Sequence, residues 1–239
     1  MIVIPARIDS SRFPNKVLAD IGGMPMVIRT AKAVMEIDKV IIAADSQEVI
    51  EAAKQYNIQA ILTSKLHQSG TDRIYEAVQK LRLDKEEIII NVQADEPFIE
   101  KRVVKAIYNL TQHNRENNSI IMNSCYKSIS KQEADDPNIV KVVTNRDERA
   151  LYFSRTKIPY QRDNHSYTYK AHLGIYGFTV ESLRQFCRLN PAPLENIEKL
   201  EQLRALYHGY QITMTEVETN SFGIDTPNDL KKALRYYKL

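Results

Sequence analysis

The stretch "IIINVQADEP", residues 88–97, decides which fold this chain can adopt. Its first five residues are almost entirely apolar and do not alternate with polar ones. Strands of this kind are buried on both faces, as in parallel sheets that helices cover from both sides. The residues that follow turn polar at Gln93, Asp95 and Glu96. We therefore expect a central strand that ends at a polar crevice.

The segments before this strand alternate between strand-like and helix-like patterns. Strands are expected at residues 1–4, 39–45 and 58–63, and helices at residues 26–35, 46–57 and 71–81. In the last of these helices, apolar residues from Ile74 to Leu81 recur at the i, i+3, i+4 and i+7 spacing of one helical face. The alternation predicts an α/β fold with a mostly parallel, doubly wound sheet.

The second half of the chain has a different character. Segments rich in β-branched and aromatic residues occur at residues 138–144, 149–155 and 171–179. They predict a smaller β-rich lobe at about 138–178. A helix over 193–207, a strand over 210–217 and a helix over 226–237 are expected after it. Because no repeat or linker interrupts the chain, we expect a single domain, 1–239, that includes this lobe.

The predicted β-rich lobe contains three aromatic residues, Tyr152, Phe153 and Tyr160. So small a lobe cannot bury all of these large apolar side chains. The lobe is therefore expected to be a dimerisation surface, at which two copies of the chain pair around a two-fold axis.

Composition limits the partners of this chain of 239 residues. Its 33 basic and 30 acidic residues give a formal net charge of +3, too balanced to indicate a nucleic-acid partner. Cys125 and Cys187 lie far apart without metal-ligand spacing, as free thiols do in a reducing cytosol. No apolar run approaches the ~18 residues of a membrane span, and the start "MIVIPAR" has no signal-peptide pattern. We expect a cytoplasmic protein without a membrane or nucleic-acid partner.

A cationic loop, "PARIDSSRFPNK", follows the first expected strand. It carries Arg7, Ser11, Arg12 and Lys16. Ligands of a doubly wound sheet bind beyond the carboxyl ends of its strands, so these side chains are placed to neutralise a polyanion such as a triphosphate. A solvated basic loop is the alternative. Neither of the common glycine-rich phosphate loops, G-x-x-x-x-G-K-[ST] or G-x-G-x-x-G, is present.

Two further segments place polar residues at the same crevice. In "HQSGTDR", Ser69 and Thr71 precede a helix that is expected to begin near Asp72, and Arg73 would point into the crevice; the alternative is a plain helix cap by Thr71. Asp95 and Asp225 each follow an expected strand. Two aspartates with phosphate oxygens and waters make a typical Mg²⁺ site, although each aspartate alone would be a cap or turn residue.

Two features of the second half have structural explanations as well as functional ones. Glu198 and Gln202 lie one turn apart in the expected helix over 193–207, where such a pair is usually solvated surface. The buried stripe of that helix is expected to include Ile197. His172 lies in an apolar strand, where a satisfied core histidine is the common explanation.

Seven segments, taken in order, resemble one enzyme family. They are "IPARIDSSRFPNK", "HQSGTDR", "NVQADEP", "ALYFSRTKIPY", "HLGIYGF", "PLENIEKLEQLR" and "GIDTPNDL". Together they are similar to the CMP-Kdo synthetases, the 3-deoxy-manno-octulosonate (Kdo) cytidylyltransferases, from Met1 to about Leu230. The first segment differs at Phe13 and Asn15, where the family more often has leucine and glycine or alanine. The third has Ala94 where glycine is usual, which would be strained if this position required a positive φ.

The resemblance implies a glycosyltransferase-A-like nucleotidyltransferase that is usually a homodimer. Its reaction would join CTP and Kdo, with Mg²⁺, to give CMP-Kdo and pyrophosphate for lipopolysaccharide biosynthesis. At the matching positions, the catalytic residues would be Lys16, Arg12, Asp95 and Asp225. The nucleotide would be bound by Arg7, Ser11, Arg12, Lys16, Ser69, Thr71, Arg73 and Gln93, and Mg²⁺ by Asp95 and Asp225. The sugar acid would face Arg155, His172, Tyr176, Glu198 and Gln202.

Two other functions fit the same segments. One is CMP transfer to a related acid sugar, such as 8-amino-Kdo or a sialic acid. The other is a non-catalytic nucleotide-binding protein, which would not need both Asp95 and Asp225 together with Lys16.

Overall fold

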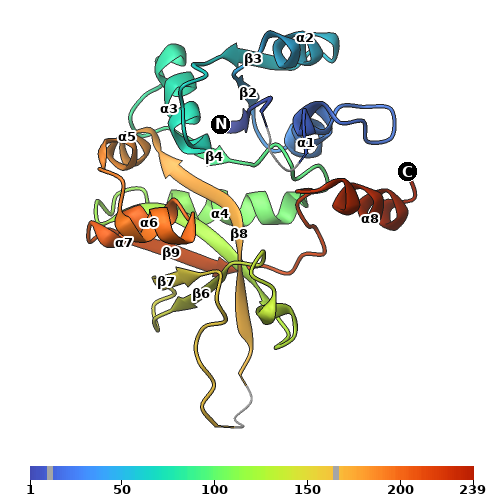
Figure 1. The fold of residues 1–239 in the computed structure, drawn as a ribbon. Helices are drawn as coiled ribbons and strands as arrows, with labels where there is room; N and C mark the ends of the chain where they lie inside the picture. Colours follow the sequence, from blue (N-terminus) through green and yellow to red (C-terminus); the bar gives the residue numbers. More distant parts are fainter. Residues whose placement is uncertain (10–12, 164–166) are drawn as a thin grey trace.

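The computed structural model describes residues 1–9, 13–163 and 167–239, and is built on one large sheet (Figure 1). Within these residues the sheet has nine strands, seven of them in the order β3-β2-β1-β4-β8-β5-β9, with β6 and β7 attached beside β8. The strands are β1 (Ile2–Ala6), β2 (Val40–Ala44), β3 (Gln59–Leu62), β4 (Ile88–Asn91), β5 (Ile120–Ile129), β6 (Lys141–Thr144), β7 (Ala150–Ser154), β8 (Tyr169–Thr179) and β9 (Gln211–Glu216). The expected α/β fold is confirmed.

The strands β1 to β4 are parallel and form one half of the sheet. β1 pairs with β2 on one side and β4 on the other, and β2 pairs with β3. The strand order therefore reverses direction between β1 and β4. In open α/β sheets the ligand crevice lies outside the carboxyl ends of the strands at such a switch point, so the residues after β1 and β4 share one crevice.

The other half of the sheet is mixed. β8 runs antiparallel to both β4 and β5, and β9 runs parallel to β5. The β6–β7 hairpin joins the sheet where Lys141 pairs with Ala171 of β8. In Figure 1 this hairpin and the lower parts of β5 and β8 lie at the opposite end of the molecule from β2 and β3.

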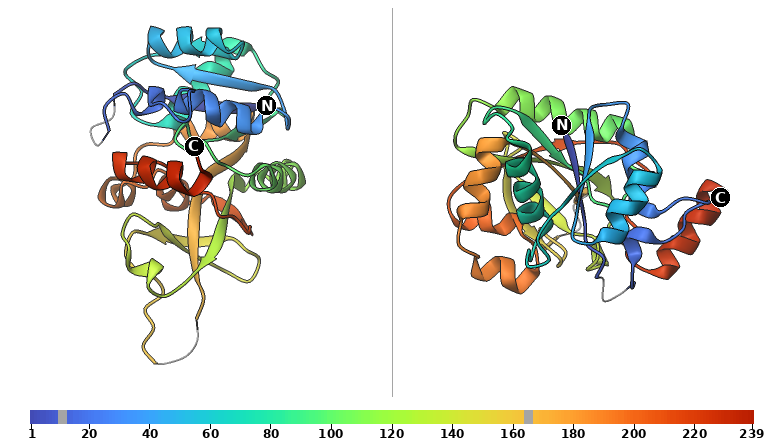
Figure 2. Two further views of the ribbon diagram at one scale, coloured as in Figure 1. Left: turned by 90° about the vertical axis from the view of Figure 1, so that its right-hand side faces the viewer. Right: turned by 90° about the horizontal axis from the view of Figure 1, so that it is seen from above.

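Helices cover both faces of the sheet, as Figure 2 shows from above. They are α1 (Met26–Val34), α2 (Gln47–Gln55), α3 (Gly70–Leu81), α4 (Lys101–Asn114), α5 (Val180–Arg188), α6 (Pro193–Glu198), α7 (Gln202–Tyr207) and α8 (Pro227–Tyr237). Buried apolar residues of α1, α2 and α4 pack on one face, and those of α3, α5 and α7 pack on the other. A separate small cluster joins α8 to Ile21 and Met26. None of the helices in these described ranges has the length and apolarity of a membrane span.

Three expectations about individual segments are wrong or incomplete. The helix expected over 193–207 is two short helices, because Lys199 takes a left-handed conformation with φ 54° and ends α6. Ile197 consequently lies 78% exposed instead of in a buried stripe. Phe153 is fully buried in the core, so it adds nothing to an exposed dimerisation surface. The elements α4, β5 and α5 were not expected from the sequence.

Candidate active site

The crevice at the switch point contains a cleft of about 320 Å³ beyond β1 and β4. Seven of the residues expected at a site line it, six of them from the first half of the chain: Arg7, Lys16, Ser69, Arg73, Gln93 and Asp95. Asp225, which comes from the segment before α8, lines it as well. Ser11 and Arg12, also expected here, lie outside the described residues.

Lys16 brings the two expected aspartates together. It begins a short 3-10 turn, Lys16–Leu18, directly after Asn15, whose φ is 53°. Its Nζ donates to Asp95 Oδ2 at 2.5 Å and to Asp225 Oδ1 at 3.0 Å. Burial of the ammonium opposes its charge, but the two carboxylates raise the pKa of Lys16 above its usual value. The site thus holds a fixed cation between two carboxylates.

Glu96 is a further acidic group at this point, and no role was expected for it from the sequence. Its burial and the neighbouring charge of Asp95 raise the pKa of Glu96 to about 8. A Cβ added at Gly223 would meet Glu96 Oε1 at 3.1 Å, so a glycine there lets the carboxyl group lie close to the backbone. Glu96 therefore holds a proton more readily than an ordinary glutamate, and it lines the larger cleft together with Asp225.

The chemistry of this donor set fits Mg²⁺ that is shared with a substrate. Asp95 and Asp225 supply hard carboxylate oxygens, and the ammonium of Lys16 shows that their spacing accommodates positive charge. Within the described ranges, no cluster of three or more His, Cys, Asp or Glu side chains could hold a metal ion alone. The other ligands of Mg²⁺ would be waters and phosphate oxygens.

The start of α3 differs from its expected form. Ser69, not Thr71, caps the helix, which begins at Gly70, because the Ser69 hydroxyl accepts from the Asp72 amide at 3.1 Å. Thr71 is fully buried and donates to Glu201 Oε1 at 2.6 Å. Thr71 does not line the cleft beyond β1 and β4, so its placement does not support a direct nucleotide contact. Gly70 is needed for close approach, since a Cβ there would lie 3.1 Å from Pro5 Cγ.

Arg73 lies at the wall of the cleft, but its guanidinium is largely occupied. It donates to Thr63 Oγ1 at 2.7 Å and to Asp45 Oδ2 at 3.1 Å, and the side chain is 3% exposed. Burial lowers the pKa of Arg73 from its usual value. The arrangement ties the ends of β2 and β3 to α3 and holds the cleft wall in place.

A second, larger cleft of about 840 Å³ adjoins the first one. Gln93 and Asp225 line both clefts. Arg155, His172, Tyr176 and Gln202, all expected at the sugar acid, line the larger one. The structure therefore separates the expected nucleotide residues from most of the expected sugar residues, with Gln93 and Asp225 at the junction.

Buried neutral groups form one part of the wall of the larger cleft. Gln202 accepts from the Tyr176 hydroxyl at 3.3 Å and lies 3.4 Å from His172 Nδ1. His172 Nε2 lies 2.9 Å from Ser124 Oγ. Burial lowers the pKa of His172 to about 3, so the imidazole is neutral at physiological pH. Gln202 is 2% exposed, so the alternative that it lies on the solvated surface of the helix is wrong.

Glu198 and Arg155 were both expected at the sugar acid, but only Arg155 lines the larger cleft. The carboxylate of Glu198 accepts from Ser154 Oγ at 2.6 Å and from the Arg155 amide at 3.0 Å. It does not line the cleft, whereas Arg155 does. Glu201, three residues later, lines the cleft and was missed. The break in the helix at Lys199 causes the change, because it turns Glu201 and Gln202 inward instead of continuing the face of Glu198.

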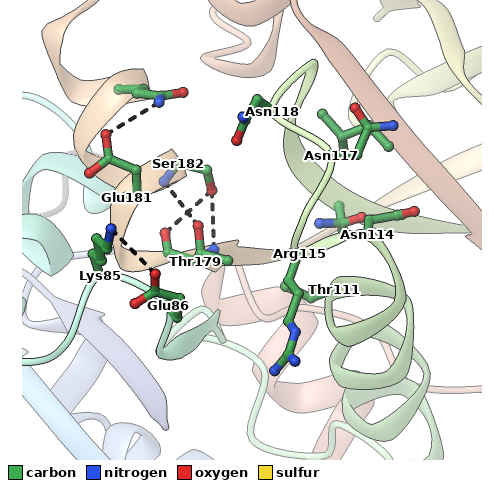
Figure 3. Close-up of a pocket in the computed structure, with 13 residues that line it drawn as sticks. Lys85, Glu86, Thr111, Asn114, Arg115, Asn117, Asn118, Thr179, Glu181 and Ser182 are labelled. Atoms are coloured by element: carbon green, nitrogen blue, oxygen red, sulfur yellow. Dashed lines mark hydrogen bonds and ion pairs between the residues drawn. The ribbon is translucent and has the colours of Figure 1, made fainter.

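A third hollow lies apart from all the predicted site residues (Figure 3). It has a volume of about 160 Å³ and includes Lys85, Arg115, Thr179 and Glu181 in its lining. The hydroxyls and amides at the start of α5 that face it already bond one another, since Thr179 and Ser182 cap the helix reciprocally. No residue of the two clefts takes part.

Comparisons with known proteins give the family of the chain. A family model described as cytidylyltransferase matches residues 1–214. The chain belongs to the cytidylyltransferase family. Within that family, the 3-deoxy-manno-octulosonate cytidylyltransferase of a Nitratiruptor species is 57% identical over 232 residues, 97% of each chain. The protein of the same name from Wolinella succinogenes is 52% identical over 241 residues, 99% of each chain.

A solved structure of the cytidylyltransferase family has the same fold. It is CMP:2-keto-3-deoxy-manno-octonic acid synthetase complexed with CTP, which is 39% identical to this chain. The TM-score is 0.88, and the match covers 100% of this chain and 98% of that one. The expected nucleotidyltransferase fold, and the family that the sequence motifs resemble, are both confirmed.

Proposed function

We propose that this chain transfers the cytidylyl group of CTP to Kdo, which yields CMP-Kdo and pyrophosphate. The observation that carries the proposal is the meeting of Lys16, Asp95 and Asp225 in the smaller cleft, where Asp225 also lines the larger one. One cleft has Arg7 and Lys16 beside two carboxylates and suits a triphosphate with Mg²⁺, and the other is larger, neutral in part and suits a polyhydroxylated acid. The full-length likeness to 3-deoxy-manno-octulosonate cytidylyltransferases supports this assignment.

In the reaction, a sugar hydroxyl oxygen forms a bond to the α-phosphorus of CTP. The bond from that phosphorus to the bridging oxygen breaks, pyrophosphate leaves in line, and the hydroxyl proton passes to solvent. Charge builds on the pyrophosphate, and Lys16 neutralises it because its ammonium lines the same cleft as Arg7 and can turn from the carboxylates to the phosphates. Arg7, on the wall of the same cleft, adds positive charge for the phosphates.

The sugar acid is held in the larger cleft. Arg155 offers a cation for its carboxylate, while Tyr176 and Gln202 offer hydrogen-bonding groups to hydroxyls. Gln93 touches both substrates from the junction. Because His172 is neutral and its nitrogens face Ser124 and Gln202, it orients Gln202 and does not act as a general base.

Mg²⁺ is proposed as the cofactor. Asp95 and Asp225 would hold it, and the metal would neutralise phosphate charge and lower the pKa of the attacking hydroxyl. On binding, Lys16 would release one or both carboxylates and turn to the phosphates. The two free thiols, Cys125 and Cys187, support a reducing cytoplasm as the place of the reaction.

A homodimer is proposed as the working assembly. Leu151 in β7 and Ile197 at the end of α6 are 60% and 78% exposed, and Tyr160 is 87% exposed. Exposed large apolar side chains of this kind favour pairing. Light scattering after size exclusion is expected to give twice the mass of one chain, and Leu151→Asp to reduce it. A wild-type monomer at micromolar concentration would rule out the dimer.

The experiment that tests the function measures pyrophosphate release from CTP with Kdo, 8-amino-Kdo or a sialic acid. We expect release with Kdo that requires Mg²⁺ and does not occur with the enzyme omitted. Faster release with another acid sugar would assign that substrate instead. Tight CTP binding without release from any sugar would indicate a non-catalytic nucleotide-binding protein.

A further inference from the structure

Lys141, the first residue of β6, is a fully buried cation. It lies in the sheet between Ser154 of β7 and Ala171 of β8. Moving an ammonium group out of water is costly unless its hydrogen-bond donors are all satisfied. An apolar residue would fill this position at lower cost, so the lysine requires an explanation.

Three backbone carbonyls receive the ammonium. Lys141 Nζ donates to the carbonyl oxygens of Asp136 at 2.9 Å, Ile139 at 2.6 Å and Arg155 at 2.5 Å. An ammonium has three N–H donors, so each is used once. All three acceptor residues line the larger cleft. The ammonium therefore joins two separate stretches of chain that form one wall of that cleft.

The side chain of Arg155 adds a further bond between the same two stretches of chain. Its guanidinium donates to the carbonyl of Pro137 at 3.2 Å and to that of Glu198 at 2.8 Å. The wall formed by residues 136–139 is thus connected to Arg155 through its backbone and through its side chain. Carbonyls outside regular strand pairing need donors, and a lysine supplies three from one position.

We infer that Lys141 is a positioning residue for the acid-sugar side of the cleft: its ammonium fixes Arg155 and the 136–139 segment against each other. The inference rests on the proposed function, since it assigns Arg155 to the sugar acid. Lys141 itself does not line the cleft and touches neither substrate. The nucleotide cleft shares none of the three carbonyl partners, so the effect is confined to one substrate.

The test compares Lys141→Met with Lys157→Met. Methionine keeps the length and apolar stem of lysine but removes the donors. Lys157 is the matched control, because it pairs with the side chain of neighbouring Asp135 from outside the cleft. For Lys141→Met we expect the KM for Kdo to rise about tenfold and the KM for CTP to change less than about twofold, as for a misplaced binding group. Lys157→Met should leave both unchanged.

Lys141→Gln, which keeps two N–H donors, serves if the methionine variant does not fold, and is expected to raise the KM for Kdo by a smaller factor. Thermal melting of each variant identifies general destabilisation. Equal rises in both KM values, or no rise in either for a folded variant, would overturn the inference. If wild-type enzyme releases no pyrophosphate with any acid sugar, the proposed function fails and the inference fails with it.

Discussion

The two clefts achieve their chemistry in opposite ways. The cleft proposed for the nucleotide has charged side chains on segments that follow strand ends, and its Lys16–Asp95–Asp225 group keeps part of each carboxylate in contact with solvent. The cleft proposed for the sugar acid adds to Arg155 neutral groups that are buried within the sheet and α7, such as His172 and Gln202. Charges in solvent-accessible segments can exchange partners when a polyanion arrives. Buried neutral groups are fixed in advance, which suits recognition of hydroxyl geometry.

The largest expected effect would test the charged side of this comparison. Asp95→Asn and Asp225→Asn each remove one negative charge but keep the size of the side chain. We expect each to lower kcat by roughly 10²-fold or more, because the two act as a unit. The double variant should be little worse than either single one. Pyrophosphate release measured over a range of Mg²⁺ concentrations checks this, and excess Mg²⁺ should restore part of the rate.

A shared metal would be contradicted if the fold-loss in kcat of the double variant equalled the product of the two single losses and added Mg²⁺ restored none of it. Thermal stability provides the control. Both variants should melt close to the wild-type temperature, since each carboxylate is partly exposed and the partly buried Lys16 keeps the other one as a partner.

A smaller effect is expected when one of the buried neutral groups of the larger cleft is replaced. Gln202→Leu removes the group that links His172 to Tyr176 and leaves both without that partner. We expect the kcat/KM for Kdo to fall by about tenfold, the cost of leaving buried polar groups unpaired, with CTP binding unchanged. Steady-state kinetics with each substrate varied in turn measures this. Gln112→Leu, at an exposed position of α4, is the matched control; equal losses for both substrates would contradict the division into two clefts.

The pH dependence of stability should identify His172 as a buried neutral group. Its folded pKa of about 3 lies below the ordinary value of 6.5, so the unfolded chain takes up a proton first as pH falls. Its contribution to stability is therefore full above about pH 6.5 and declines as pH falls toward 3. Between pH 7 and pH 5 we expect wild type to lose on the order of 2 kcal/mol more than His172→Gln.

Urea denaturation at several pH values measures that difference. His113→Gln is the control, because His113 is an exposed histidine on α4. Parallel stability curves for wild type and His172→Gln would show that the imidazole is not held neutral.

The smallest effects concern two departures from the family pattern. Ala94 does not have a positive φ, so the strain considered for this position does not arise, whereas Asn15 has φ 53°. Ala94→Gly is expected to lower the free energy of unfolding by about 0.5–1 kcal/mol through greater freedom of the unfolded chain. Asn15→Ala should cost about 1 kcal/mol, because alanine tolerates the left-handed region poorly. Chemical denaturation checks both, and a stabilised Ala94→Gly would contradict the backbone assignment.

Sequence reasoning succeeded best where a residue's place follows from the strand before it. Lys16, Asp95 and Asp225 were expected in one crevice, and the structure brings them together. Reasoning failed where local pattern and tertiary packing disagree. The stretch 193–207 has helical periodicity throughout, yet Lys199 interrupts it. That break exposes Ile197 and turns Glu201 into the larger cleft.

The sequence by itself determined the α/β class, the parallel first half and the polar residues beyond its strands, because alternation and hydrophobic period are local properties. Only the tertiary structure decided that β8 runs antiparallel between β4 and β5 and that Thr71 meets Glu201 across 130 residues. It alone showed that Lys141 is buried beneath three carbonyls. Such contacts depend on which distant segments pack together, and the stability of a buried polar group depends on partners that no local pattern specifies.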